Sequence, residues 1–354
     1  LHLSLRRQRQ MCIRDSARGT RGNTKLSWRR CSSRPMTYAS APGKIVLWGE
    51  YAVLTGAAAG VMALSNRASI RMEPSADKRW HFESKGFFCE PASCPSDELP
   101  NSPQSTFLRL ILAHWGYRSL AECSTPLHIT TDSSPFFAAN QKLGLGSSAA
   151  VCTATYRALC ALTRRSPALS EVMALHRDWQ GGKGSGLDVA SAWHGGLIHF
   201  QQGLGTPADW PEDLYWQVVW SGKSAKTTDH ITHFDQWRNQ ADNTPLNHLG
   251  ALSNEICEKG PNLPLLTEYC QTLKALDEAA ILNIFTQEQG RLGKLAAASG
   301  ALYKPCGAGG GDIGIAFSDD PHGIAAFRQQ AAASGFLPLD LEMATNGVAF
   351  QQRQ

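Results

Sequence analysis

The sequence predicts a two-domain protein that mixes α-helices and β-strands, with an α/β domain first and an α+β domain after it. Three observations support this prediction. The chain has 354 residues, more than a single hydrophobic core usually serves. Strand-like and helix-like patterns alternate along its first half. The composition then changes after residues 203–211, so we place the domains at 36–210 and 211–354.

Residues 1–35 differ from the rest in charge. They contain ten Arg or Lys residues and one acid, a net charge of +9, which leaves −5 for the remaining residues of a chain with formal charge +4. An Arg-rich, acid-poor leader is typical of an organelle transit peptide. Residues 10–16, however, resemble translated library-adaptor sequence. We favour a translation artefact with Met36 as the natural start, and exclude this disordered leader from the fold.

Charge, hydropathy and cysteine placement exclude several classes of protein. The mildly acidic body argues against nucleic-acid binding, which needs a basic patch on the folded part. No apolar run reaches the roughly 18 residues of a membrane span. The ten cysteines form no C-x-x-C pair, which favours a reducing compartment, and we expect a cytoplasmic protein. The oligomeric state stays open.

Periodicity predicts the elements of the first domain in order. Lys44 is expected to open a short buried strand. Further strands are expected at 65–73, 80–83, 87–89, 126–131 and 197–201, and helices at 106–115, 151–162 and 170–180.

The second domain starts with a predicted strand at 214–220. Residues 245–300 have a mostly helical pattern, a strand follows residue 312, and a helix is expected at 321–333. Two short strands, near 336–339 and 347–351, complete the α+β pattern. The segment Gly222-Lys223-Ser224 is not a Walker A loop, because Gln217 stands where that motif requires glycine.

Residues 142–150 read Lys-Leu-Gly-Leu-Gly-Ser-Ser-Ala-Ala and lead into a predicted helix. Gly144 and Gly146 allow the backbone to approach a ligand closely, and the N–H groups at a helix start attract anions. Ser147 and Ser148 add hydroxyls for a phosphate or Mg²⁺, and Lys142 adds a positive charge. We interpret this stretch as a phosphate-binding loop, although serines that only cap a helix would give the same pattern.

Two charged residues stand beside other glycines. Lys44 lies between Gly43 and an apolar run, where an unpaired ammonium would be costly, so we expect an anionic partner. Asp188 follows the glycine-rich residues 181–186 and is either a helix N-cap or a carboxylate that approaches a phosphate-bearing substrate together with Lys183.

A third glycine segment precedes the strand after residue 312. Four of the five residues 307–311 are glycine, more than a structural turn needs. A second close approach to a ligand is the favoured explanation.

The ordered motifs Pro42-Gly43-Lys44 with Gly49-Glu50-Tyr51, then 144–149, then 307–312, resemble the GHMP kinase superfamily over nearly all of residues 38–350. The runs Gly-Glu-Tyr-Ala-Val-Leu, residues 184–190 and Gly-Gly-Gly-Asp resemble its phosphomevalonate kinases most. Mevalonate kinases tend to have His at the position of Tyr51.

The resemblance implies a fold and a set of site residues. The N-terminal α/β domain would contain an unusual left-handed β-α-β crossover and the C-terminal domain would be ferredoxin-like. The cofactors would be ATP and Mg²⁺, with Lys44 and Asp188 catalytic and Ser148 the Mg²⁺ ligand. The resemblance also implies that ATP would be bound by Lys142, Gly144, Leu145, Gly146, Ser147, Ser148 and Ala149. The substrate would be bound by Lys183, Ser185, Gly307, Ala308, Gly309 and Gly310.

The expected substrate is 5-phosphomevalonate, which would become 5-diphosphomevalonate on the mevalonate route to isoprenoids. The alternatives are a mevalonate kinase, a non-catalytic sensor of the same fold and, with a poorer fit, a diphosphomevalonate decarboxylase. One departure concerns the metal. Mevalonate kinases have a Mg²⁺-binding Glu eleven residues before the Asp, and Arg177 occupies that position here.

Overall fold

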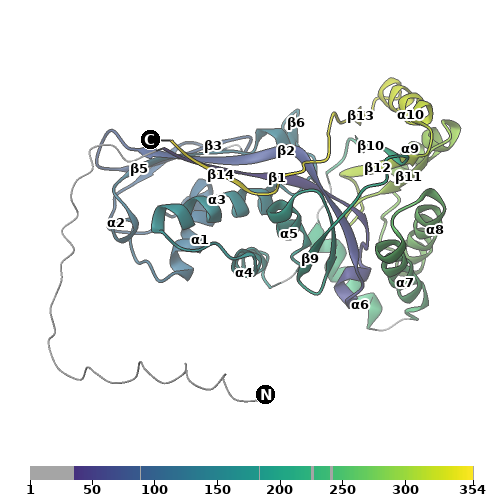
Figure 1. The fold of residues 1–354 in the computed structure, drawn as a ribbon, viewed down its shortest axis with the longest axis horizontal. Helices are drawn as coiled ribbons and strands as arrows, with labels where there is room; N and C mark the ends of the chain where they lie inside the picture. The colour runs from purple at the N-terminus through teal and green to yellow at the C-terminus, as the bar shows by residue number, and fades with distance from the viewer. Residues whose placement is uncertain (1–35, 88, 183, 225–226, 240–241, 354) are drawn as a thin grey trace, which may run out of the picture. The chain divides into compact units, whose positions relative to one another are not determined.

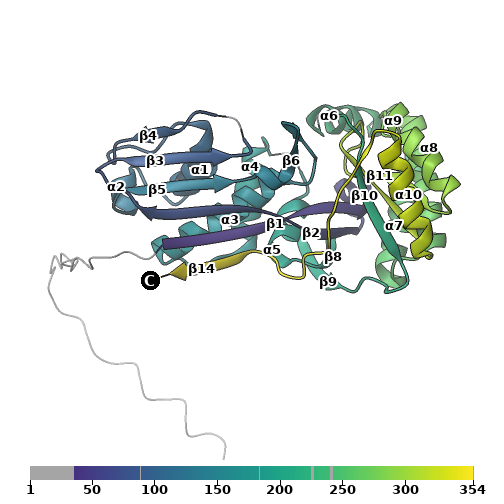
Figure 2. The ribbon, with the colours of Figure 1, turned by 90° about the horizontal axis from the view of Figure 1, so that it is seen from above.

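The larger of two main sheets is built mostly by the first half of the chain. The computed structural model describes residues 36–87, 89–182, 184–224, 227–239 and 242–353. The sheet has the strand order β14-β1-β2-β5-β3-β4, and β8 and β9 extend it from β2 (Figures 1 and 2). Its strands are β1 (Met36–Trp48), β2 (Ala59–Pro74), β3 (Trp80–Lys85), β4 (Ala92–Cys94), β5 (Leu127–Asp132), β8 (Leu197–Gln201), β9 (Leu204–Ala208) and β14 (Ala349–Arg353). The pair β3–β5 is parallel and the other pairs are antiparallel.

The structure corrects two predictions about this sheet. Lys44 does not open a short strand, because β1 already starts at Met36 and continues through Pro42 and Gly43. The register with β2 shifts at the Pro42–Gly43 step, and such a bulge accommodates proline and glycine inside a strand. Residues 87 and 89 are not in a strand, and the next strand is β4.

Helices cover one side of this sheet (Figure 1). The central helix α3 buries small side chains such as Ala150, Ala154 and Ala158 against β1 and β2, which brings its axis close to the strands. The helices are α1 (Thr106–His114), α2 (Leu120–Cys123), α3 (Ser147–Thr163), α4 (Leu169–Trp179) and α5 (Leu187–His194). Short elements complete this half: 3-10 helices at Ala52–Thr55, Pro103–Ser105 and Ser134–Phe136, and the strand pair β6 (Phe137–Ala138) and β7 (Gln141–Lys142).

The second sheet has the order β11-β12-β10-β13 and is antiparallel throughout. Its strands are β10 (Tyr215–Trp220), β11 (Leu302–Pro305), β12 (Ile313–Ser318) and β13 (Leu337–Pro338). In chain order this is 2-3-1-4, the order of a ferredoxin-like sheet, so the expected α+β class is confirmed. The helices are α6 (Thr227–Arg238), α7 (Thr244–Lys259), α8 (Leu263–Ala280), α9 (Gln287–Ala298) and α10 (Pro321–Ala333).

The chain changes sheet between β9 and β10, and then returns. After β13 the chain crosses back, Met343 forms a bridge to Leu64, and β14 pairs with β1. The division at residues 210 and 211 therefore stays a prediction. No helix in the described part of the chain is long and apolar enough to cross a membrane.

Candidate phosphate-transfer site

The loop before α3 has the backbone expected of a phosphate-binding loop. Gly144 and Gly146 have φ of +82° and +80°, a region that favours glycine, and Gly146 is the N-cap of the 17-residue helix α3. The first N–H groups of that helix have no partner within the helix and point out of its N-terminus, as anion binding requires. Ser147 is buried and Ser148 is half-buried in this first turn.

Lys44 and Asp188 form an ion pair beside this loop. Lys44 Nζ lies 3.2 Å from Asp188 Oδ1, and their side chains are 11% and 30% exposed. The Lys44 backbone N–H also donates to the carbonyl of Leu145 at 2.9 Å, which fixes β1 to the loop. A Cβ on Gly146 would lie 3.0 Å from two carbons of the Lys44 side chain, so this glycine leaves space for the lysine. The anionic partner expected for Lys44 is Asp188.

The glycine segment 307–311 lies against both of the other glycine motifs. At one end Tyr51 Oη donates to the carbonyl of Ala308 at 2.5 Å. At the other end a Cβ on Gly144 would lie 2.6 Å from Cβ of Asp312. Gly309 is equally confined, because its Cβ would lie 2.6 Å from Cα of Ile284. The three motifs that are far apart in the sequence therefore meet.

The segment Gly222-Lys223-Ser224 also reaches this region, although its sequence is not that of a Walker A loop. The carbonyl of Lys223 accepts from the Asp312 backbone N–H at 2.6 Å, and Ser224 Oγ donates to the carbonyl of Lys142 at 3.1 Å. It thus bridges the loop before α3 and the glycine segment, a structural contact that the sequence did not predict.

The remaining predicted binding residues lie at the edge of this site. Lys142 is exposed at the end of β7, two residues before Gly144. Ser185 Oγ accepts from the Leu187 backbone N–H at 3.4 Å, next to Asp188. Lys183, predicted to bind substrate, lies outside the described residues.

Helix α4 presents a histidine to the predicted metal ligand. His176 Nε2 lies 3.3 Å from Ser148 Oγ, while Arg177, where mevalonate kinases have Glu, is exposed. Burial lowers the pKa of His176 below 6.5, although nearby Asp188 raises it, so the ring is neutral at pH 7. Within the described residues no cluster of three His, Cys, Asp or Glu side chains could hold a metal ion. A Mg²⁺ ion here would thus depend on Ser148, water and the phosphates.

A buried polar group that the motifs did not predict lies behind the site. Glu50 Oε1 pairs with Lys304 Nζ, and their side chains are 1% and 0% exposed. Tyr269 Oη donates to Glu50 Oε2 at 2.7 Å and accepts from the Gly49 N–H at 2.7 Å. Two residues beyond Lys304, burial raises the pKa of the Cys306 thiol to about 12, so this thiol is protonated at pH 7.

A cavity of about 340 Å³ opens beside the start of α3. Lys142, Ser147 and Ser148 line one end. Aromatic rings form much of the remaining wall, from Phe82, Phe87, Phe107, Phe137 and Trp179. A largely apolar cavity bordered by a lysine and two serines at the start of a helix has the chemistry that a nucleoside triphosphate requires.

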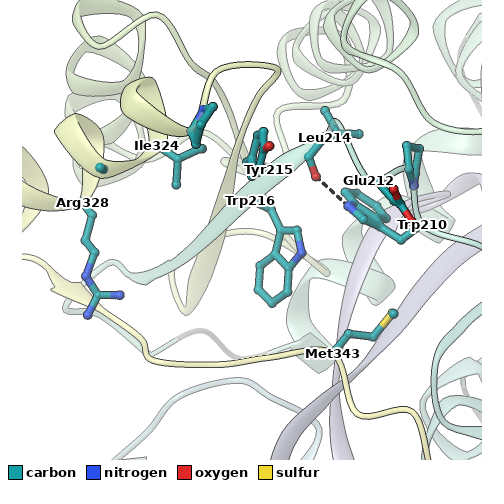
Figure 3. A pocket seen from close by; sticks show the side chains of 11 residues that line it. Trp210, Glu212, Leu214, Tyr215, Trp216, Ile324, Arg328 and Met343 are labelled. Atoms are coloured by element: carbon teal, nitrogen blue, oxygen red, sulfur yellow. Dashed lines mark hydrogen bonds between the residues drawn. The ribbon is translucent and has the colours of Figure 1, made fainter.

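A second cavity, of about 580 Å³, lies elsewhere (Figure 3). Trp210, Tyr215 and Trp216 line it together with Arg328 of α10, and Trp210 Nε1 donates to the carbonyl of Leu214 at 2.7 Å. None of the predicted site residues borders this cavity.

Comparison with known proteins identifies the class. Residues 106–196 match the family described as GHMP kinases N terminal domain. The chain belongs to the GHMP kinase superfamily.

Two curated relatives within this superfamily are named phosphomevalonate kinase. The protein from Streptomyces sp. (strain CL190) is 32% identical over 248 residues, 59% of this chain and 66% of that protein. The protein from Saccharolobus solfataricus is 26% identical over 339 residues, which cover 87% of this chain and 97% of that protein.

A solved structure is similar over almost its whole length. Streptococcus pneumoniae phosphomevalonate kinase in complex with phosphomevalonate and AMPPNP has a TM-score of 0.70 and 20% identity, and the match covers 86% of this chain and 99% of that one. This likeness confirms the fold.

Proposed function

We propose that the protein transfers the γ-phosphoryl group of ATP to 5-phosphomevalonate and forms 5-diphosphomevalonate, a step of the mevalonate route to isoprenoids. The observation that carries this proposal is the Lys44–Asp188 ion pair, which lies directly beside the glycine loop at the start of α3. The two curated phosphomevalonate kinases support the choice of acceptor.

The residues present fit ATP and Mg²⁺. The triphosphate would lie on Gly144–Ser148, where two glycines with positive φ expose backbone N–H groups, and the base would enter the adjoining aromatic cavity. Ser148 would be the protein ligand of Mg²⁺, and Leu145 and Ala149 would contribute backbone to the loop. The bound Mg²⁺ would neutralise charge on the transferring phosphoryl group.

The acceptor determines what Lys44 and Asp188 do. A phosphomonoester has a second pKa near 6 and is mostly ionised at pH 7, so the reaction needs no general base. The difficulty is bringing two anions together, which Lys44, Lys142 and Lys183 would offset with their positive charge. Asp188 would then orient Lys44 by the observed ion pair. The segment 307–310 and Ser185 would enclose the acceptor.

The two members of the ion pair should respond differently to substitution. We expect Lys44→Met to lower kcat by roughly 1,000-fold, because it removes a cation from the transferring phosphoryl group. Asp188→Asn should cost less, about 10-fold to 100-fold, because an amide still holds the lysine by a hydrogen bond. Steady-state kinetics with both substrates measures this. An equal collapse of both variants would mean that Asp188 acts as a base.

The proposed activity is tested by ADP release from the full chain with Mg-ATP, with 5-phosphomevalonate and mevalonate offered in separate reactions. Turnover with 5-phosphomevalonate alone is the expected result. Turnover with mevalonate alone would assign an alcohol kinase with Asp188 as base, and ATP binding without turnover would assign a sensor or another acceptor.

We also propose a cytoplasmic location. Cys89 and Cys94, the two cysteines close enough in sequence to suggest a bridge, are free thiols, as a reducing compartment would leave them.

A further inference from the structure

The ion pair between Glu50 and Lys304 connects the two halves of the site. Glu50 follows β1, the strand that contains Lys44, and Lys304 lies in β11, directly before the glycine segment. Both side chains are fully buried. The two residues are 254 positions apart in the sequence, so the pair joins the larger sheet to the second sheet.

Two further contacts run alongside this ion pair. Tyr269 of α8 binds both the Glu50 carboxylate and the Gly49 backbone, so the carboxylate has a neutral donor as well as a charged one. Tyr51 donates to the carbonyl of Ala308 within the glycine segment. The turn at residues 49–51 thus contacts the glycine segment and the strand that leads into it.

The far end of the glycine segment has its own contacts. Gln289 Nε2 donates to the carbonyl of Gly311 at 2.9 Å, and the Asp312 N–H donates to the carbonyl of Lys223. The near end continues from β11, which pairs with β12, and there the Cys306 N–H donates to the carbonyl of Ile313 at 3.0 Å. The turn at 49–51 contacts both β11 and the segment itself. Glycines have the widest backbone freedom of any residue, so a segment this rich in them takes its position from its anchors.

The energetics of the Glu50–Lys304 ion pair favour a role in positioning over a role in stability. Burying two opposite charges costs about as much desolvation energy as their attraction returns, so an apolar pair of similar volume is often equally stable. A buried ion pair does fix distance and direction, because both charges become costly when they separate. Because the Glu50–Lys304 pair lies between the strand that contains Lys44 and the glycine segment, it is placed to set the distance between them.

We propose that Glu50 and Lys304 are positioning residues that hold the glycine segment at the distance from Lys44 that phosphoryl transfer needs. This inference builds on the proposed function, because it assigns residues 307–310 to the acceptor side. Neither residue touches the reacting atoms in this proposal. They act through the segment that encloses the acceptor.

The test separates positioning from stability with a neutral pair. Glu50→Gln and Lys304→Met each leave one buried group without its partner, and we expect both single variants to melt well below the wild type. The double variant Glu50→Gln/Lys304→Met removes both charges and keeps an acceptor for Tyr269. Its melting temperature should return close to that of the wild type.

The double variant should regain the stability of the wild type without regaining its activity. The double variant should keep the KM for ATP, because the loop before α3 is held by β1 and not by this pair. Its kcat should be roughly 100-fold low and its KM for 5-phosphomevalonate raised, since small misplacements in a transfer site cost about that much. Recovery of wild-type kcat together with melting temperature would overturn the proposal and leave a purely structural ion pair.

Amide hydrogen exchange provides a readout that does not depend on turnover. Peptides covering 306–312 should exchange faster in the double variant, while peptides covering 142–150 should not change. Unchanged exchange at 306–312 would also overturn the proposal. If the wild type fails to turn over 5-phosphomevalonate, the proposed function fails, but this measurement still tests the anchor.

A control variant accounts for general destabilisation. Leu120→Ala removes volume from the core under α2, which covers the larger sheet well away from β11 and β12 (Figure 1). It should lower the melting temperature while kcat and exchange at 306–312 stay at wild-type values at 25 °C.

Discussion

Two separate constraints, one on the backbone and one on the available space, exclude a side chain at Gly144. Its φ of +82° is unfavourable for any residue with a Cβ, and that Cβ would lie 2.6 Å from Cβ of Asp312. Gly116, at the end of α1, has a nearly identical φ of +81° but open space around it. The two glycines therefore form a matched pair that separates backbone strain from steric conflict.

We expect Gly116→Ala to lower the free energy of unfolding by about 1 kcal/mol through strain alone. Gly144→Ala should cost a further 1–3 kcal/mol, roughly, because Asp312 must move. It should also weaken ATP binding, which Gly116→Ala leaves intact. Urea unfolding and nucleotide titration measure the two effects. Equal losses of stability in the two variants would argue against a close approach between the glycine motifs.

Among individual residues, the sequence predicted the site residues that have glycines nearby and missed those that do not. Lys44 and Asp188 were identified because each lies within two residues of a glycine, and the structure brings them within 3.2 Å. Tyr269 and Lys304 were not identified. Tyr269 has the helical spacing of an ordinary core residue, and Lys304 precedes its glycines in a strand whose distant partner no local pattern indicates.

Among the elements, the segment before β14 is joined to β1 and β2 by one arginine in addition to its backbone hydrogen bonds. Arg67 in β2 donates to Ser40 Oγ and the Ser40 carbonyl at 3.0 Å each, to the carbonyl of Asn346 at 3.0 Å and to that of Gly347 at 2.6 Å. It thus ties β1 and β2 to the segment that returns from the second sheet.

Arg67→Met should lower the free energy of unfolding by on the order of 3 kcal/mol, because it leaves several half-buried carbonyls without a charged donor. Arg71→Met, four residues along the same strand, is the control. Arg71 is about half exposed and pairs with Glu73, so its loss should change stability by less than about 1 kcal/mol. Chemical unfolding of both variants measures the two losses of stability. A small loss of stability in Arg67→Met would show that the segment is held mainly by strand pairing.

Elements with a clean local pattern were predicted accurately. The helix at 321–333 and the strand at 197–201 have the expected limits. The beginning of β1 was missed because Pro42 and Gly43 resemble a turn, and only pairing with β2 across a bulge keeps them in a strand. The strand expected at 87–89 was wrong at its two described residues, Phe87 and Cys89, which are not in a strand, while Phe88 lies outside the described residues. Phe87 is exposed and borders the aromatic cavity instead.

For the molecule as a whole, three histidines link stability to pH. Burial lowers the pKa of His176, His194 and His199 below 6.5. Below that pH the unfolded chain binds protons that the folded chain does not accept, so stability must fall as the pH drops. Carboxylates add the same trend only at lower pH, since their unperturbed pKa values are near 4.

The melting temperature should accordingly decrease from pH 7.5 to pH 5.5. His199→Gln, which removes a half-buried ring in contact with Trp48, should make this decrease smaller. His322→Gln, at an exposed position near the start of α10, should leave it unchanged. A melting temperature that is constant or rises over this range would contradict the prediction.

The pairing of β14 with β1 has a consequence for synthesis on the ribosome. Met36 and Arg353 are direct partners in this pairing, so the larger sheet takes its edge strand from a segment that lies beyond the second sheet in the sequence. While the protein is being translated, the free edge of β1 stays open until β14, more than 300 residues later, has left the exit tunnel. An unpaired strand edge can pair with another chain. The nascent protein is therefore exposed to aggregation through this edge in the interval after the second sheet has emerged and before β14 follows it.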